Sequence, residues 1–108
     1  MIQTLAALAE PNRLRIVELL RVRPHLVGEL SEALGVRQPQ VSKHLSTLKQ
    51  AGLVNVRPDA QKRLYELRFE PFRELDSWLE DYRKLWAERF DELDGVIAEI
   101  KQKRKGKR

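Results

Sequence analysis

Residues 26–54 read LVGELSEALGVRQPQVSKHLSTLKQAGLV, and the pattern predicts two short helices joined by a tight turn. Apolar residues recur at helical spacing over residues 27–34, which predicts the first helix. Gly35 follows, at a position where the end of a helix commonly needs a left-handed residue. The second helix is predicted over residues 38–50, with Pro39 tolerated in its first turn. Two helices arranged in this way form a helix-turn-helix.

The second of these helices has two different faces, because successive residues turn by about 100° around a helix. Its apolar side chains cluster on the side that we expect to face the core, namely Val41, Leu45 and Leu48. The outward side carries amides, hydroxyls and one amine, which can pair with base edges in the major groove of DNA. The residues that we expect to read bases are Gln38, Gln40, Ser42, Lys43 and Thr47. A merely solvated polar face is the alternative.

The sequence on either side of this motif predicts two more helices and a hairpin. A short first helix ends before Pro11, and Pro11 begins a second helix over residues 11–23 that Pro24 stops. After the motif, apolar and polar residues alternate over residues 53–69, which predicts two short strands. The turn between them is predicted at residues 58–61, which are rich in turn-forming residue types.

The tip of the predicted hairpin is basic. Arg57, Lys62 and Arg63 crowd it, and Asp59 is the only acid that we expect nearby. A basic hairpin beside a helix-turn-helix could be a wing that contacts phosphates or an adjacent groove. The alternative is a solvated loop that happens to be basic.

A long last helix is predicted over residues 71–100. Its apolar residues take eight steps from residue 72 to residue 100, an average of 3.5 residues, which is the coiled-coil period. A stripe of this length is too much to bury against so small a domain, so we expect a dimer interface formed by Leu79, Tyr82, Trp86, Phe90, Leu93 and Ile97. Two alternatives remain: a ligand pocket lined by the aromatic residues, and a surface that recruits another protein.

The elements together predict a mainly α fold with one β-hairpin, in the order α-α-α-α-β-β-α. The chain of 108 residues is long enough for one small domain, which we place at residues 1–100. Residues 101–108 read KQKRKGKR and are predicted to be a disordered basic tail, which is either a plain solvated end or an element that adds sequence-independent attraction to phosphates. The chain lacks cysteine, so neither a disulfide nor a thiolate metal site can form. It shows no apolar run of membrane-spanning length and no signal pattern, so we expect a cytoplasmic protein.

Charge is distributed unevenly along the chain. Residues 1–69 carry 11 Lys and Arg against 6 Asp and Glu, whereas residues 70–100 carry 4 against 10. A basic first part favours a polyanionic partner such as nucleic acid.

An enzyme is excluded by geometry. Ser42 and His44 are close in sequence, but two residues apart on a helix they point about 200° apart around its axis. They therefore cannot act together as nucleophile and base. His44 lies at the edge of the core face, which favours a structural role.

Three stretches together resemble the ArsR/SmtB family of winged-helix repressors: EPNRLRIVELL, the motif of residues 26–54, and VRPDAQKRLYEL. The resemblance implies a homodimer that binds a palindromic operator and blocks transcription, with half-sites about one helical turn apart, roughly 10 base pairs or a multiple. It implies that the first helix, with Leu5 and Leu8, joins the last helix in the dimer interface. Base-reading positions of the family fall on Gln38, Gln40, Ser42 and Lys43, and phosphate contacts on Arg37 or Ser46 and on the wing.

The chain departs from the family at several positions. Arg37 stands where a Ser or Thr usually caps the helix, and residues 60–61 are Ala-Gln where the wing tip usually has Gly-Arg. Residues 26–28, Leu-Val-Gly, replace the Cys-Val-Cys of the metal sensors, and the last helix has no histidine. We therefore expect no metal site and no cofactor. The carboxylates of the last helix are expected to be solvated surface charges: Glu88, Asp91, Glu92 and Asp94.

Overall fold

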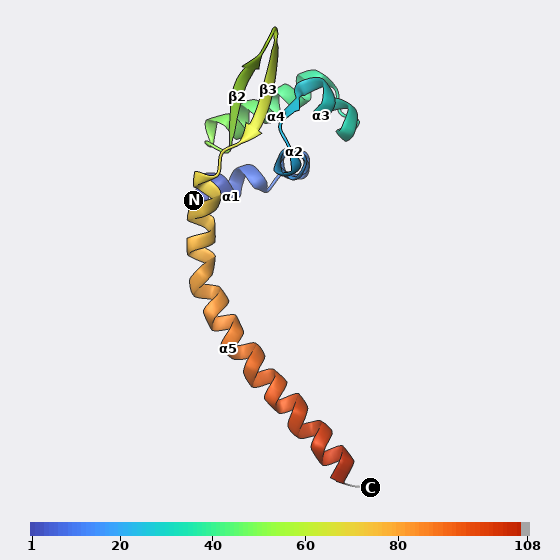
Figure 1. Cartoon of the computed structure of the whole chain (residues 1–108), viewed down its shortest axis with the longest axis vertical. Helices are drawn as coiled ribbons and strands as arrows, with labels where there is room; N and C mark the ends of the chain where they lie inside the picture. The colour runs from blue at the N-terminus through green and yellow to red at the C-terminus, as the bar shows by residue number, and fades with distance from the viewer. Residues whose placement is uncertain (107–108) are drawn as a thin grey trace. The chain divides into compact units, whose positions relative to one another are not determined.

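The computed structural model describes residues 1–106 (Figure 1). The elements follow in the order α1 (Ile2–Leu8), α2 (Pro11–Val22), β1 (His25–Leu26), α3 (Val27–Leu34), α4 (Gln38–Gln50), β2 (Val54–Asp59), β3 (Lys62–Leu67) and α5 (Glu70–Gly106). This order confirms the predicted mainly α fold with a β-hairpin, apart from the additional short strand β1. The chain divides into two compact units, Met1–Glu74 and Leu75–Arg108, which are described separately.

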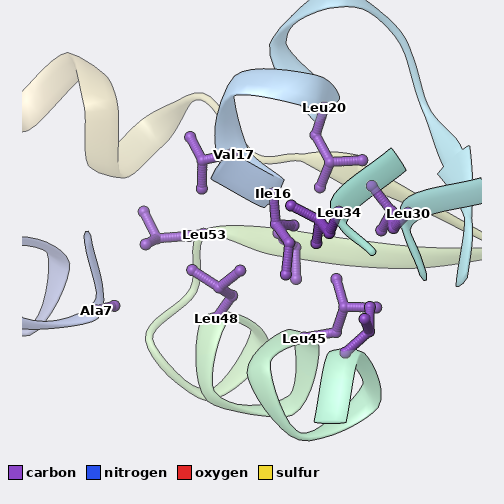
Figure 2. Close-up of a cluster of buried hydrophobic side chains, with 11 residues drawn as sticks. Ala7, Ile16, Val17, Leu20, Leu30, Leu34, Leu45, Leu48 and Leu53 are labelled. Carbon is purple, nitrogen blue, oxygen red and sulfur yellow. The ribbon is translucent and has the colours of Figure 1, made fainter. Parts of the chain in front are cut away.

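The first unit is built around one apolar core, to which α2, α3 and α4 each contribute one face (Figure 2). The predicted core face of α4 is confirmed, because Val41, Leu45 and Leu48 are at most 1% exposed. Ile16 of α2 and Leu30 of α3 are fully buried against them. Full burial of a Leu or Ile side chain contributes about 1.5–3 kcal/mol, so this core fixes how α4 is held against the other helices.

The turn of the helix-turn-helix has the predicted glycine. Gly35 has a φ of 67°, in the left-handed region, and its N–H donates to the carbonyl of Ser31 at 2.9 Å. The N–H of Val36 donates to the same carbonyl at 3.3 Å, and the Ser31 hydroxyl donates back to the Val36 carbonyl. These bonds close the turn so that only three residues separate α3 from α4.

The sequence pattern does not predict strand β1, which His25 and Leu26 form after α2. His25 pairs with Tyr65 and Leu26 pairs with Leu64, so the described residues form an antiparallel sheet in the order β1-β3-β2. His25 is buried, with its Nδ1 2.7 Å from the carbonyl oxygen of Arg23. Two residues are too few to show an alternating pattern, and their partners lie about 40 positions further along the chain.

The hairpin turn is shorter than predicted. Pro58 and Asp59 belong to β2 and pair with Arg63 and Lys62, so the loop consists only of residues 60–61. Proline fits there because β2 is an edge strand, where a missing N–H costs no sheet hydrogen bond.

Helix α5 continues past its predicted end at residue 100 and reaches Gly106. The expectation of a disordered tail is therefore wrong for residues 101–106, and residues 107–108 lie outside the described part of the chain. Lys, Gln and Arg are good helix formers, so the loss of the apolar pattern after Ile100 does not end the helix. Within the described residues, no helix is long and apolar enough to cross a membrane.

Candidate nucleic-acid interface

The outward face of α4 presents the predicted base-reading residues to solvent. All of them are exposed, while the opposite side of the same helix is locked in the core. They are Gln38, Gln40, Ser42, Lys43 and Thr47, and Ser46 is exposed beside them. The hydroxyl of Thr47 donates to the Lys43 carbonyl at 3.2 Å, so it can offer a partner only its oxygen lone pairs while that bond holds.

The first turn of α4 lacks the usual cap. Arg37 occupies the N-cap position in an extended conformation, and within the described residues its side chain makes no capping hydrogen bond. Its carbonyl instead accepts hydrogen bonds from the N–H groups of Gln40 and Val41, at 3.0 and 3.1 Å. The exposed guanidinium of Arg37 thus stands at the positive end of the helix dipole, a favourable place for an anion.

Gly28 lies against the side chain of Gln38, which the sequence did not show. A Cβ atom added to Gly28 would lie 3.4 Å from the Gln38 amide nitrogen, in ordinary contact. A larger side chain at residue 28 would compete with Gln38 for this space. The absence of a side chain at Gly28 of α3 therefore leaves room for the Gln38 amide.

A surface concavity joins α3, α4 and the hairpin. Gly28 and Glu29 line it from α3, Ser42 from α4, and Lys62 and Arg63 from β3. Glu29 is the single carboxylate among these residues, and it already has two hydrogen-bond partners. The N–H of Leu26 donates to Glu29 Oε1 at 2.9 Å, and Arg23 donates to Glu29 Oε2 at 3.0 Å. These bonds, the backbone bond foremost, lower the pKa of Glu29. Its charge is thus balanced by neighbours, which reduces its repulsion of an approaching phosphate.

The hairpin carries its predicted basic side chains at the surface. Arg57, Lys62 and Arg63 are all exposed. The expectation that Asp59 is the only acid nearby is wrong, because Glu66 of β3 places Oε2 3.9 Å from the Arg57 guanidinium. Arg57 therefore has a competing intramolecular partner. Lys62 and Arg63 also line the concavity beside Ser42, so they are the hairpin cations that adjoin the face of α4.

His44 connects α4 to the start of α2. Its Nδ1 lies 3.7 Å from the Glu10 carboxylate, and Glu10 caps α2 by accepting the N–H of Arg13 at 2.8 Å. That backbone hydrogen bond is the main reason that the pKa of Glu10 is lowered. The contact agrees with the structural role predicted for His44.

The predicted dimer-interface residues fall into two groups. Leu5 is 40% exposed, whereas Leu8 packs against the core of its own unit and offers less surface. On α5, the predicted stripe residues are all between 39% and 58% exposed: Leu79, Tyr82, Trp86, Phe90, Leu93 and Ile97.

No group of three or more metal-ligating side chains comes together within the described residues. The absence of a metal site remains a prediction. The carboxylates of Glu88, Asp91, Glu92 and Asp94 are exposed along α5.

Residues 10–56 match the model of the bacterial regulatory protein arsR family. The transcriptional repressor SmtB of Mycobacterium tuberculosis is 46% identical over 65 residues, which are 60% of this chain and 48% of SmtB. The chain spans about half the length of the relatives with higher sequence identity, from 48% to 57%. The HTH-type transcriptional regulator Rv0081 of the same species is 34% identical over 95 residues, which are 87% of this chain and 81% of the relative.

Solved structures show the same fold. Reduced HlyU from Vibrio cholerae has a TM-score of 0.63 and 34% identity, covering 75% of this chain and 85% of HlyU. The homodimeric winged helix-turn-helix DNA-binding domain of Mb0332 from Mycobacterium bovis has a TM-score of 0.63 and 26% identity, covering 77% of each chain. The predicted winged helix-turn-helix fold is thereby confirmed. The family consists of regulators, which agrees with the prediction that the chain is not an enzyme. The chain belongs to the arsR family of bacterial regulatory proteins.

Proposed function

We propose that this chain is a transcriptional repressor that binds a palindromic operator as a homodimer, each copy laying α4 into a major groove. The observation that carries the proposal is the division of α4 into a buried apolar face and an exposed face of amides, hydroxyls and amines. The relative SmtB is a repressor and the Mb0332 domain is a DNA-binding homodimer, which supports the same function here.

The side chains of the exposed face can form hydrogen bonds with base edges. Gln40 can donate to and accept from an adenine edge, and Lys43 can donate to guanine. Ser42 and Ser46 are short, so the helix backbone can approach the groove closely. No residue of α4 is acidic, so the helix does not repel the phosphates.

Phosphate contacts would come from the cations around this face. Arg37 stands at the start of α4, and Lys62 and Arg63 stand on the hairpin beside it. Each neutralised phosphate releases counterions, so affinity should fall steeply as the salt concentration rises.

The homodimer would form through the exposed apolar stripe of α5, with Leu5 of α1 as a second contact. A two-fold symmetric protein matches a palindromic operator whose half-sites lie about 10 base pairs apart, or a multiple of this. Metal is not proposed as the signal that releases the operator, because Leu26, Val27 and Gly28 at the family's metal-binding positions offer no ligand side chain.

The test compares binding to a DNA site selected from random sequence with binding to the same site shuffled. In Gln40→Ala we expect a loss of roughly 5- to 150-fold on the selected site, since a good bidentate base contact discriminates by about 1–3 kcal/mol. Binding to shuffled DNA should change little. Gln50→Ala is the matched control, because it removes the same amide from the last residue of the same helix. Fluorescence anisotropy at fixed salt gives all the affinities.

An equal loss on both DNAs would show that Gln40 contacts only phosphate or sugar. Failure to select any preferred sequence would contradict the proposed function itself.

A further inference from the structure

Helix α5 carries a broad apolar surface that the second unit does not cover within the described residues. Trp86 is 53% exposed and Phe90 is 58% exposed, with their rings stacked at 6.1 Å between centroids. Trp78 and Tyr82 form an edge-to-face pair at 5.0 Å one to two turns earlier. Large aromatic side chains are stabilised the most when they are removed from water, so this surface favours a partner that covers it.

The charges along α5 alternate in sign by blocks. Residues 74–82 carry four acids and no base, and residues 83–89 carry three bases and one acid. Residues 90–99 then carry four acids and no base, and residues 100–104 carry three bases and no acid. The sequence of signs is therefore minus, plus, minus, plus.

This alternation distinguishes the two ways in which identical helices can pair. In a parallel pair in register, each block faces its own copy, so like charges meet along the whole helix. In an antiparallel pair centred near Phe90, residues 100–104 face residues 75–79, and residues 83–89 face residues 90–96. Every block then faces one of opposite net sign, apart from individual residues at the block boundaries. Charged residues that flank an apolar seam set the orientation of coiled coils in this manner.

The apolar stripe fits the same antiparallel register. With the helices centred near Phe90, three pairs of stripe residues lie at matching heights: Leu79 with Ile100, Tyr82 with Ile97, and Trp86 with Leu93. The apolar layers and the charge blocks thus agree on one alignment.

A second antiparallel alignment satisfies the stripe but not the charges. If Trp86 lay on the two-fold axis, Tyr82 would face Phe90 and Leu79 would face Leu93. However, the acidic residues 74–82 would then face the acidic residues 90–98. Electrostatic repulsion disfavours this register.

The acidic block already attracts a cation in the single chain. Arg83 forms ion pairs with Asp76 and, at 3.1 Å, with Glu80. The hydrogen bond that Arg83 donates to the Asp76 carboxylate raises the pKa of Arg83. In the alignment centred near Phe90, the partner's basic end reaches this acidic block and shares Asp76 with Arg83.

We propose that two copies of α5 pair antiparallel with Phe90 near the two-fold axis, so that the basic end at Lys101, Lys103 and Arg104 of each copy lies on the acidic block around Asp76 of the other. This rests on the proposed homodimer and specifies its geometry. The basic end of α5 is then a docking element between the copies.

Engineered cysteines test the alignment directly, because the chain has no cysteine of its own. A disulfide needs Cα atoms about 4.4–6.8 Å apart. Leu79→Cys and Ile100→Cys should each remain uncrosslinked under mild oxidation, and an equal mixture of the two should give a crosslinked dimer. Phe90→Cys alone should crosslink, and Trp86→Cys alone should do so much less.

Self-crosslinking of Leu79→Cys would show a parallel pair and overturn the proposal. Stronger self-crosslinking of Trp86→Cys than of Phe90→Cys would show the other antiparallel register and also overturn it. Sedimentation of each reduced variant is the companion measurement. Dimers without any predicted crosslink would overturn the alignment alone, whereas an unmodified chain that sediments as a monomer would overturn the proposed homodimer.

Charge reversal provides a test that leaves the apolar stripe intact. Lys103→Asp and Asp76→Lys should each weaken dimerisation by roughly tenfold, because the symmetric pair contains the contact twice. The double variant should recover most of the affinity. Asp76→Lys also breaks the contact with Arg83 in the same helix, which Lys103→Asp cannot repair. Recovery therefore supports a contact between copies, and its absence would contradict one.

Discussion

Ala60 at the hairpin tip is held in a conformation that suits glycine. Its φ is 58°, in the left-handed region, where a residue with a Cβ is strained by about 1–2 kcal/mol. Ala60→Gly should remove the strain but add about 0.5–1 kcal/mol of chain entropy cost. We expect a net gain of about 0.5–1 kcal/mol in the free energy of unfolding, measured by urea denaturation at one fixed protein concentration.

The matched control is Gln61→Gly, the other residue of the two-residue loop. It should lower the stability by about 0.5–1 kcal/mol, because it incurs the entropy cost without relieving strain. Equal losses in the two variants would contradict strain at Ala60.

Glu10 makes stability depend on pH. Its carboxylate accepts the Arg13 N–H and faces His44, and its pKa is lowered in the folded protein. A lowered pKa means that the stabilisation is present above the pKa of the unfolded chain and is lost as the pH falls through the folded value. Glu10→Gln should therefore be less stable than the parent at neutral pH, with the difference shrinking on acidification. Urea unfolding across a pH series measures it.

Glu18→Gln is the control for this experiment, since it removes an exposed carboxylate from the same helix. A difference that stayed constant from neutral to acidic pH would show that the charge of Glu10 does not contribute.

The burial of an individual residue can be predicted where a single helical period determines which side of the helix it occupies. Val41, Leu45 and Leu48 recur at helical spacing, so their burial followed from the sequence. The contacts of Arg57 with Glu66 and of Gln38 with Gly28 did not follow from the sequence. Each contact joins two elements, and no local pattern specifies their register or packing.

At the scale of elements, the stripe of α5 should be decisive for assembly. Trp86→Glu places a charge in the middle of the stripe, where its burial in an interface would be costly, so we expect monomers in sedimentation. Ser77→Glu is the matched control, since it adds the same charge to a residue outside the stripe. An unchanged dimer in Trp86→Glu would contradict the assignment of the interface.

The helices of the central motif were predicted to the residue, and the other elements less well. The bounds of α3 and α4 are marked by a left-handed glycine, a first-turn proline and a sustained apolar period. Strand β1 has no such signals, since its existence depends on a distant partner in β3. The end of α5 was placed too early because apolar periodicity reports burial, whereas the backbone continues wherever helix-forming residues allow.

The molecule as a whole carries two distinct surfaces, one on each unit. The first unit presents α4 and the hairpin, whose cations and amides suit DNA. The second unit is a helix with an apolar stripe and alternating charge blocks, which suits a second copy of the chain. The sequence predicted both surfaces, because patterns within single helices carry them. The concavity between α3, α4 and β3 emerged only from the packing of the three.

The most direct test of the central claim is methylation protection of a selected operator by the full chain. Dimethyl sulfate attacks guanine N7 in the major groove, so a helix lying there protects it. We predict two protected major-groove patches, related by a two-fold axis and centred about 10 base pairs apart or at a multiple of that spacing. A single patch, or binding that leaves every guanine N7 reactive, would contradict a homodimer that reads DNA with α4.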